Sequence, residues 1–336
     1  MRFKNKINKN KKGVWRYADF YDEFIKAENR LSLNNQNSLI HEGDILECRL
    51  RELNYNHLYF KREDENVCGS LKERSLAYQV SLAKQNRKNK LVISTSGNAG
   101  IAGAAYCQKA GIKLYIFISP ETERAKIAEM QKYNPIIIKS KRTIRLANYL
   151  AAKYKIENLR PSINNSSIEG FKSIAFEIFE DLGEVDVIFT FITSGSSFVG
   201  IGRAYQYLLG SKEIKKMPKL FAVQNKDSFS IAGALGIKNT RRKKEILEII
   251  KSTGGDNIYV NNNEILEAKN ILKKNKISTS PEGCASFAGV IKVNEKNKFN
   301  KSVCILSGKL RGEVNIIDES KIYKAESFDE VDEIVN

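Results

Sequence analysis

Short apolar segments alternate with helix-like segments from residue 90 onward, and this rhythm limits the fold more than any other feature. The β-branched, strand-like segments cover 90–95, 112–118, 135–140, 185–192, 219–224 and 302–307. The segments with helical spacing cover 97–111, 121–133, 142–154, 168–183, 198–210 and 283–293. Strands that alternate with helices of about a dozen residues form βαβ units, so the pattern predicts an α/β fold with parallel-rich sheets flanked by helices.

A polar stretch, "ENLRPSINNSS" at 157–167, interrupts this rhythm and indicates a crossover loop. With 336 residues the chain is long enough for two cores. We therefore expect two α/β lobes with a ligand cleft between them. Residues 1–63 and 161–336 would form the larger lobe, and residues 64–160 a smaller, mobile one.

The chain is strongly basic, with 56 Lys and Arg against 39 Asp and Glu and a net charge of +17. The first sixteen residues carry basic side chains and no acidic one (Arg2, Lys4, Lys6, Lys9, Lys11, Lys12 and Arg16). A nucleic-acid-binding arm is one interpretation. The same Lys- and Asn-rich texture recurs in "VNEKNKFNK", however, so we expect solvated faces that steer anionic small molecules and no nucleic-acid partner.

The cysteines and histidines argue against a disulfide framework and a metal site. The five cysteines are scattered, with no Cys-x-x-Cys (Cys48, Cys68, Cys107, Cys284 and Cys304), which indicates a reducing compartment. His41 and His57 are the only histidines. No run reaches the ~18 apolar residues of a membrane span, and no signal peptide is visible. These features predict a cytoplasmic protein with no membrane partner.

Three segments place a small polar turn between a strand and a helix. They are "STSGNAG" (94–100), "TSGSS" (193–197) and "LSGKL" (306–310). Helix N-termini offer unpaired N–H groups and a positive dipole end, so such turns favour anions. A fourth segment, "CGSLKERSLAYQV" (68–80), puts Lys72 in a first helical turn among apolar residues. By itself Lys72 is either an ordinary charge at a helix start or a lysine held in a site.

Taken in order, six segments of the chain resemble the pyridoxal-phosphate enzymes of the tryptophan-synthase-β type, fold type II. These segments are "GSLKER", "STSGNAG", "IEGFKSIAFEIFEDLG", "TSGSSFVGIGRAY", "EGCASFAGV" and "LSGK". Within that group, "GVWRYADF", "RLSL", "FKRED" and "IEGFKSIAFEI" are most similar to threonine synthase. The resemblance runs along nearly the whole chain. It implies a two-lobed enzyme with pyridoxal 5'-phosphate in the inter-lobe cleft.

The resemblance also assigns roles. Lys72 would be the Schiff-base lysine and the proton-shuttling base, which requires a readily deprotonated amine. Asn98 would bind the cofactor's ring hydroxyl, and Ser307 would face the pyridine nitrogen as a neutral partner, so carbanion stabilisation is mild. The cofactor phosphate would lie on Thr193, Ser194, Gly195, Ser196 and Ser197. The substrate would be held by Ser94, Thr95, Ser96, Gly97, Ser162 and Asn164.

Two departures from threonine synthases concern the substrate. The usual Gly-rich "GEGNTPL"-like segment is "NNQNSLI" here (Asn34–Ile40), and the arginine expected to hold a substrate phosphate is Ser167. Loss of a bidentate arginine removes a strong charge-assisted contact. Either Arg160, Lys172 or Arg74 compensates, or the substrate is not O-phosphohomoserine.

These features together predict a pyridoxal-phosphate-dependent lyase or synthase. The expected reaction is threonine-synthase-like, from O-phosphohomoserine and water to threonine and phosphate, in a homodimer. The substrate would be a small amino acid, phosphorylated or not. The alternatives are a cysteine- or cysteate-synthase-like β-replacement enzyme, a serine/threonine dehydratase, and a catalytically reduced paralogue that only binds an amino acid.

Overall fold

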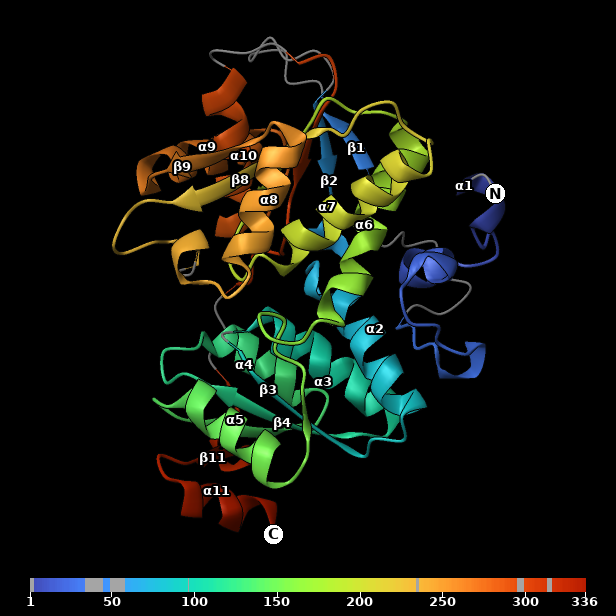
Figure 1. Ribbon diagram of the computed structural model, residues 1–336. Coiled ribbons are helices and arrows are strands. Elements are labelled where there is room, and N and C mark those ends of the chain that lie inside the picture. Colours follow the sequence, from blue (N-terminus) through green and yellow to red (C-terminus); the bar gives the residue numbers. More distant parts are fainter. Residues whose placement is uncertain are drawn as a thin grey trace. The chain divides into compact units, whose positions relative to one another are not determined.

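The computed structural model describes residues 3–33, 45–48 (backbone only), 58–95, 97–233, 236–294, 299–312 and 316–336. The chain divides into two compact units. The first unit comprises Met1–Tyr21, Leu39–Leu71 and Phe171–Leu310, and the second comprises Asp22–Ser38, Lys72–Gly170 and Arg311–Asn336. Each unit holds one sheet with its own helices (Figure 1).

The sheet of the first unit has six strands in the order β1-β2-β10-β7-β8-β9. They are β1 (Ile45–Cys48), β2 (Leu58–Lys61), β7 (Val187–Phe191), β8 (Lys219–Asn225), β9 (Asp256–Val260) and β10 (Ser302–Ile305). β1 pairs with β2 antiparallel, while β2, β10, β7, β8 and β9 pair in parallel. The predicted α/β architecture with parallel-rich sheets is confirmed.

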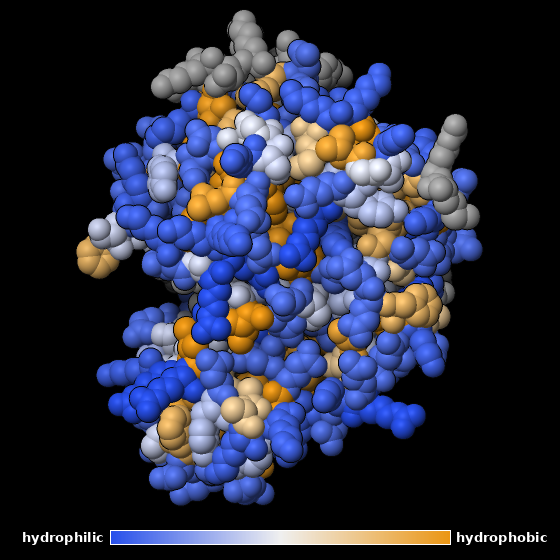
Figure 2. All heavy atoms as spheres, in the orientation of Figure 1, coloured by the Kyte–Doolittle hydropathy of each residue, from blue (hydrophilic) through white to orange (hydrophobic). Residues whose placement is uncertain are grey.

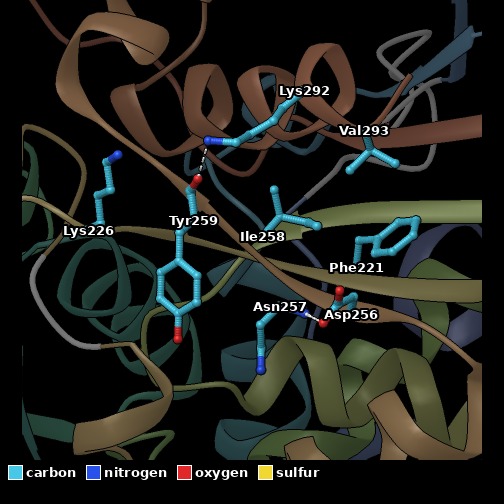
Figure 3. A pocket seen from close by; sticks show the side chains of 8 residues that line it. All are labelled: Phe221, Lys226, Asp256, Asn257, Ile258, Tyr259, Lys292 and Val293. Atoms are coloured by element: carbon cyan, nitrogen blue, oxygen red, sulfur yellow. Dashed lines mark hydrogen bonds between the residues drawn. The ribbon is translucent and has the colours of Figure 1, made fainter. Parts of the chain in front are cut away.

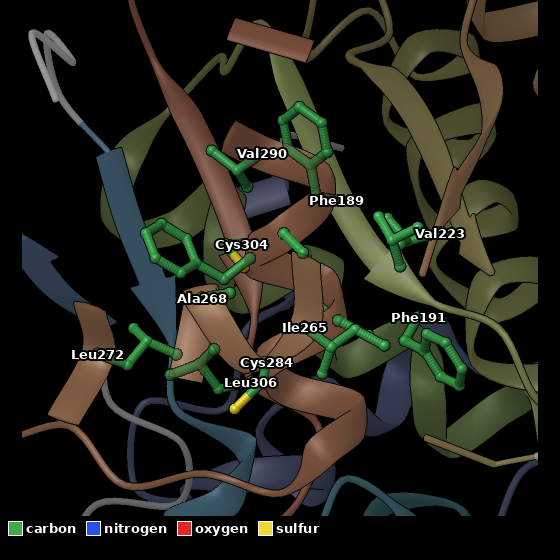
Figure 4. Close-up of a cluster of buried hydrophobic side chains, with 14 of the residues drawn as sticks. Phe189, Phe191, Val223, Ile265, Ala268, Leu272, Cys284, Val290, Cys304 and Leu306 are labelled. Atoms are coloured by element: carbon green, nitrogen blue, oxygen red, sulfur yellow. The ribbon is translucent and has the colours of Figure 1, made fainter. Parts of the chain in front are cut away.

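Five longer helices accompany this sheet. They are α6 (Ser167–Leu182, of which the part from Phe171 belongs to this unit), α7 (Ser196–Gly210), α8 (Lys243–Thr253), α9 (Asn262–Lys274) and α10 (Pro281–Asn294). One face of the sheet packs on α9 and α10 through a buried apolar cluster, drawn in Figure 4. Phe189, Val223 and Cys304 supply the strand side, while Ile265 and Val290 supply the helix side. The cluster fixes β7 and β8, and therefore the turns at their carboxyl ends.

The N-terminal segment docks on the same unit through aromatic side chains. It contains α1 (Phe3–Lys6) and the 3-10 helix η1 (Gly13–Phe20). Phe3 packs on Phe176 with ring centroids 5.6 Å apart. Arg16 forms an ion pair with Glu180, and this hydrogen-bonded pairing lowers the pKa of the Glu180 carboxyl. Part of the basic N-terminus is thus used to attach this segment.

The sheet of the second unit has five parallel strands in the order β11-β5-β4-β3-β6. The strands are β3 (Lys90–Ser94), β4 (Lys113–Ile118), β5 (Ile136–Lys139), β6 (Glu157–Asn158) and β11 (Ile322–Lys324). The helices are α2 (Lys72–Gln85), α3 (Asn98–Ala110), α4 (Arg124–Gln131), α5 (Thr143–Lys153) and α11 (Phe328–Val335). The predicted helices and strands between residues 90 and 154 all recur here.

The C-terminal segment differs from the expected domain boundaries. Residues 22–38, 161–170 and 311–336 belong to the second unit, whereas the prediction assigned them to the larger lobe. Residues 64–71 belong to the first unit, whereas the prediction assigned them to the smaller lobe. β11 pairs with β5, and Phe328 of α11 stacks on Tyr149 with centroids 4.1 Å apart. A strand of only three residues, "IYK", carries too little apolar periodicity to be recognised in the sequence.

The surface is predominantly hydrophilic on the face shown in Figure 2, in keeping with the high charge content. Among the helices that the structure describes, none combines the length and apolar character needed to cross a membrane.

Candidate active site

Lys72 begins helix α2, and the three residues before it are pinned to the segment that contains Ser307. The Leu71 N–H donates to the Ser307 carbonyl at 3.0 Å, and the Lys309 N–H donates to the Gly69 carbonyl at 2.9 Å. Ser70 and Gly308 form an antiparallel bridge between these contacts. The segment that leads into Lys72 and the segment that contains Ser307 therefore meet through backbone hydrogen bonds. Leu71 and Ser307 are 236 positions apart in the chain. Lys72 itself is half-buried.

The same place is braced by the loop that leads into α10. The Gly308 carbonyl accepts from the Ser280 N–H at 2.6 Å and from Thr279 Oγ1 at 2.9 Å. Cys284, in the first turn of α10, is buried, and burial raises the pKa of its thiol to about 11. It stays protonated near neutral pH and is a poor nucleophile.

The turn between β3 and α3 is built from small polar residues. The Thr95 N–H donates to the Phe117 carbonyl at 3.0 Å, and the Gly97 N–H donates to Thr95 Oγ1 at 3.1 Å. Gly97 is the N-cap of α3, with φ of 153°, and no side chain caps this helix. The helix therefore presents N–H donors at its start. Ser96, which the sequence analysis assigned to the substrate, lies outside the described residues.

Two predicted substrate ligands carry buried hydroxyls that have no hydrogen-bond partner among the residues that the structure describes. Ser94 is 6% exposed and Ser162 is 9% exposed, and neither Oγ is bonded. β3 pairs with β6, and the Leu159 N–H extends the pairing by donating to the Val92 carbonyl at 2.8 Å. A buried unpaired hydroxyl costs about 1–3 kcal/mol. Ser94 ends β3, and Ser162 lies in the loop that follows β6; each hydroxyl suits a polar ligand, for instance a carboxylate.

Asn164, also assigned to the substrate, bonds within its own loop. Its Nδ2 donates to Glu157 Oε1 at 3.1 Å and to the Asn158 carbonyl at 3.1 Å, while its Oδ1 accepts from the Ser166 N–H at 2.9 Å. These contacts hold the loop that carries Ser162.

Asn98, the predicted ligand of the ring hydroxyl, is oriented by an arginine that the sequence analysis missed. Arg311 Nη2 donates to Asn98 Oδ1 at 3.2 Å. With its acceptor oxygen occupied in this way, the amide of Asn98 has N–H donors to offer to a ligand oxygen.

The turn between β7 and α7 also ends in an uncapped helix. Gly195, the N-cap of α7, has a left-handed φ of 79°, and no side chain caps the helix. Ser196 is fully buried, and Ser197 is 7% exposed. An alanine Cβ at 195 would lie 2.3 Å from Ile246 Cδ1, so only glycine combines this conformation with the close approach of α8. The arrangement is typical of an anion site.

The carbonyls of this turn are bonded to the protein. The Thr193 carbonyl accepts from the Gly236 N–H at 3.3 Å, and the Ser194 carbonyl accepts from Thr240 Oγ1 at 2.6 Å. The Gly195 carbonyl accepts from the Val199 N–H at 3.0 Å. A carbonyl oxygen that faced an anion would repel it. Because these three carbonyl oxygens accept hydrogen bonds from the protein, the turn is suited to bind an anion.

The segment that holds the turn, residues 236–246, also contains a buried arginine. Arg242 is 3% exposed, and its Nε donates to Ser196 Oγ at 3.1 Å. The sequence analysis identified neither this segment nor α8. The Arg242–Glu245 spacing and the amphipathic "KKEILEII" were the signals that could have indicated a helix start.

Ser167, which stands where the resemblance expects a phosphate-binding arginine, is fully buried. Its Oγ donates to the Pro161 carbonyl at 2.9 Å, and its carbonyl accepts from Ser75 Oγ at 2.9 Å. The alternative cations differ in exposure, since Arg74 and Lys172 are buried and Arg160 is half-buried. Asn34–Ile40, the other departure, lies outside the described residues.

A pocket of about 440 Å³ opens beside β8, β9 and α10, and none of the predicted site residues lines it (Figure 3). Its Lys292 is engaged, because Nζ donates to the Tyr259 carbonyl and to Glu264 Oε1, each at 2.8 Å. Within the described part of the chain, no group of three or more His, Cys, Asp or Glu side chains is arranged to hold a metal ion.

The chain resembles known proteins over most of its length. Residues 44–308 match the family described as "Pyridoxal-phosphate dependent enzyme". A threonine synthase of Methanocaldococcus jannaschii is 28% identical over 335 residues, covering 90% of this chain and 81% of the relative.

Solved structures show the same fold. A pyridoxal 5'-phosphate-dependent aspartate racemase has a TM-score of 0.69 at 20% identity, covering 81% of this chain and 91% of the other. An O-ureido-L-serine synthase has a TM-score of 0.68 at 18% identity, covering 80% and 90%. At such identities the likeness concerns the fold.

Proposed function

The chain belongs to the pyridoxal-phosphate-dependent enzyme family, and from that premise we propose that it is a threonine-synthase-like lyase. Its cofactor is pyridoxal 5'-phosphate, and its fold is type II. The reaction class follows the relative named threonine synthase, which matches 90% of the chain. The main structural support for an amino-acid substrate comes from Ser94 and Ser162, whose buried hydroxyls have no hydrogen-bond partner among the described residues.

The residues present fit the cofactor. The uncapped start of α7, with its engaged carbonyls, suits the phosphate, and the oriented amide of Asn98 suits the ring hydroxyl. The backbone contact between Leu71 and Ser307 supports roles for Lys72 at the cofactor aldehyde and for Ser307 at the ring nitrogen. When bound, the cofactor supplies an electron sink for the carbanion next to the substrate's amino group.

The chain's own residues orient the substrate and move protons. Ser94, Thr95, Ser162 and the N–H groups at the start of α3 would hold the carboxylate, which fixes the direction of the Cα–H bond. The neutral amine of Lys72 takes the Cα proton as a general base. In the overall reaction Cβ loses one proton and phosphate leaves Cγ, and the proton and hydroxyl of water are then added at Cγ and Cβ, respectively.

A departing phosphate needs a cation, and Ser167 does not provide one. Arg160 is the first candidate, because it lies in the same loop as Ser162, with its N–H donating to Asn158 Oδ1 at 3.0 Å. Arg160→Met should then raise the KM for O-phosphohomoserine about tenfold or more, since a charge-assisted contact contributes about 1.5–3 kcal/mol. Arg160→Lys should recover part of this loss.

The test is a steady-state comparison of substrates on the purified holoenzyme. We expect release of inorganic phosphate and formation of threonine from O-phosphohomoserine, with slower turnover of O-phosphoserine, O-acetylserine, serine and threonine. No phosphate release from O-phosphohomoserine, together with turnover of one of the others, would remove the threonine synthase assignment.

One observation favours a second candidate, a β-replacement synthase or dehydratase. Ser167 is buried and bonded where the resemblance expects a phosphate-binding arginine, so a substrate with an uncharged or smaller tail would not need that contact. Turnover of O-acetylserine with a thiol or sulfide nucleophile, or release of ammonia from serine, would identify this alternative.

A further inference from the structure

Arg242 is a cation that the fold buries directly behind the β7–α7 turn. Only 3% of the residue is exposed, and its Nε–H donates to Ser196 Oγ at 3.1 Å. Its Nη1 donates to Glu245 Oε1 at 3.0 Å. The neighbouring Arg241 is exposed. Arg242 is buried and the adjacent Arg241 is not, so we expect the contacts of the Arg242 guanidinium to have a specific role.

The surrounding contacts fix that place. The Arg242 N–H donates to Thr240 Oγ1 at 3.2 Å, and this hydroxyl donates to the Ser194 carbonyl at 2.6 Å. On the other side, Ile246 Cδ1 lies 2.3 Å from the position of a Cβ at 195, so an alanine there would displace the Ile246 side chain. Residues 240–246 therefore contact the turn at several points, and these contacts hold Arg242 next to it.

The ion pairs that the structure describes near Ser196 contain two guanidinium groups and one carboxylate. Glu245 Oε2 is bound by Arg203 Nη2 at 2.6 Å, while Glu245 Oε1 is bound by Arg242. Two guanidinium groups thus share one carboxylate, and these three side chains carry a net positive charge. The Arg203 side chain is 42% exposed, so water screens its share of this charge, whereas the buried guanidinium of Arg242 lies next to Ser196 and makes the potential at the turn more positive, which favours an anion there.

The contact also sets the direction of the Ser196 hydroxyl. A hydroxyl has one O–H donor and two acceptor lone pairs. Because Arg242 donates to the oxygen, the hydroxyl hydrogen points away from the guanidinium, and Ser194 Oγ, at 3.3 Å, is one group within its reach. A cation on the acceptor side also strengthens the hydroxyl as a donor.

We infer that Arg242 is the positioning residue that makes the β7–α7 turn selective for the phosphorylated form of the cofactor, by directing the Ser196 hydroxyl and supplying positive charge behind it. The inference rests on the proposed assignment of this turn to the cofactor phosphate. It adds a residue on α8's N-terminal side, 46 positions from Ser196, to a site otherwise made of neutral hydroxyls and backbone N–H groups.

The test compares pyridoxal 5'-phosphate with pyridoxal, which lacks the phosphate, on the full-length protein stripped of cofactor. Dissociation constants for both are measured by absorbance or fluorescence titration for wild type, Arg242→Met, Arg242→Lys, Ser196→Ala and the matched control Arg241→Met. The readout is the ratio of the two constants, which a general loss of packing would leave unchanged.

We expect Arg242→Met to lower the preference for the phosphorylated form about tenfold or more, the loss typical of one charge-assisted contact, with pyridoxal affinity within about twofold of wild type. Arg241→Met should keep the wild-type ratio. Ser196→Ala should lower it less, and should add little in the Arg242→Met background, because the two residues act through one contact.

An unchanged ratio in Arg242→Met, or equal weakening of both ligands, would overturn the inference. If Arg242→Met does not fold, Arg242→Lys decides, because it keeps the charge but loses the Nε donor; we expect a reduced ratio, and a wild-type ratio would overturn the inference. A wild-type protein that binds no cofactor, or binds both forms equally, would instead contradict the proposed function of the turn.

Discussion

The β3–α3 turn of the second unit and the β7–α7 turn of the first unit share one local design. Each follows a buried parallel strand, uses Ser and Thr residues, and places a glycine with positive φ at the N-cap (Gly97 at 153° and Gly195 at 79°). Neither α3 nor α7 has a side-chain cap. From the local sequence alone, both would bind an anion.

The two turns differ in what lies behind them. At the β3–α3 turn the nearby hydroxyl of Ser94 has no partner in the described part of the chain, and Asn98 is oriented by Arg311. At the β7–α7 turn the carbonyls are bonded and Ser196 is backed by Arg242. A fixed cation suits a dianionic phosphate, while unpaired neutral hydroxyls suit a carboxylate that must bind and leave. The supporting contacts, more than the turn sequence, distinguish the two sites.

The largest effect is expected if a cation is forced into the second unit at Ser167. This residue is fully buried and uses both its hydroxyl and its carbonyl. Ser167→Arg should reduce the free energy of unfolding by about 3 kcal/mol, because it buries an unpaired charge in a packed site. Urea unfolding measures this change, with the exposed Asn165→Arg as control.

The resemblance to threonine synthases implies a different outcome: if no other cation compensates, an arginine at 167 would improve the use of a phosphorylated substrate. A Ser167→Arg protein with wild-type stability and faster phosphate release would show that the second unit accepts a cation there. It would then weaken the contrast between the two turns.

The next effect concerns Gly195. An alanine there needs a left-handed φ and places Cβ against Ile246, so we expect a loss of about 1–3 kcal/mol from backbone strain and overpacking. Because the turn would shift, affinity for pyridoxal 5'-phosphate should fall in parallel. Thermal unfolding and cofactor titration measure both. Gly210→Ala is the control, since it lies at the other end of α7 with open space around it.

Gly195→Ala with normal cofactor affinity would mean that the phosphate does not depend on this turn. Equal behaviour of the 195 and 210 variants would lead to the same conclusion.

Much of the fold was predictable from the sequence. The spacing of hydrophobic residues and the positions of turn residues indicate the elements from β3 to α5 and the elements β7 and α7. The elements α8, β9 and α9 were missed, although Asn261 and Glu264 form a capping box at the start of α9. The resemblance predicted which turns would bind the cofactor and the substrate. It could not identify Arg242, because pairing with Ser196 depends on a tertiary contact that neither segment encodes alone.

The sequence also did not predict which buried serine hydroxyls are hydrogen-bonded. Ser94 and Ser167 are both buried serines, yet one hydroxyl is unpaired and the other is bonded to Pro161. Nothing in the neighbouring residues separates the two, because the difference depends on which carbonyl the loop 159–166 brings into reach.

The smallest effect is expected for Ser94→Ala. Removing an unpaired buried hydroxyl should leave the stability unchanged or slightly raised, while the KM for the amino-acid substrate rises about two- to tenfold, equal to one neutral hydrogen bond. Ser75→Ala is the matched control, because its hydroxyl is bonded to the Ser167 carbonyl and its loss should cost about 1 kcal/mol of stability. A Ser94→Ala enzyme with an unchanged KM would argue against a carboxylate site at the β3–α3 turn.

The most direct test of the whole account is to locate the cofactor on the chain. The holoenzyme is reduced with borohydride, digested, and the lysine that carries the pyridoxyl group is identified by mass spectrometry. We predict a single modified lysine, Lys72, and a loss of activity in Lys72→Ala of about 10²–10⁴-fold or more, as expected for removal of the general base. A stable adduct on another lysine, or an active Lys72→Ala enzyme, would contradict the account.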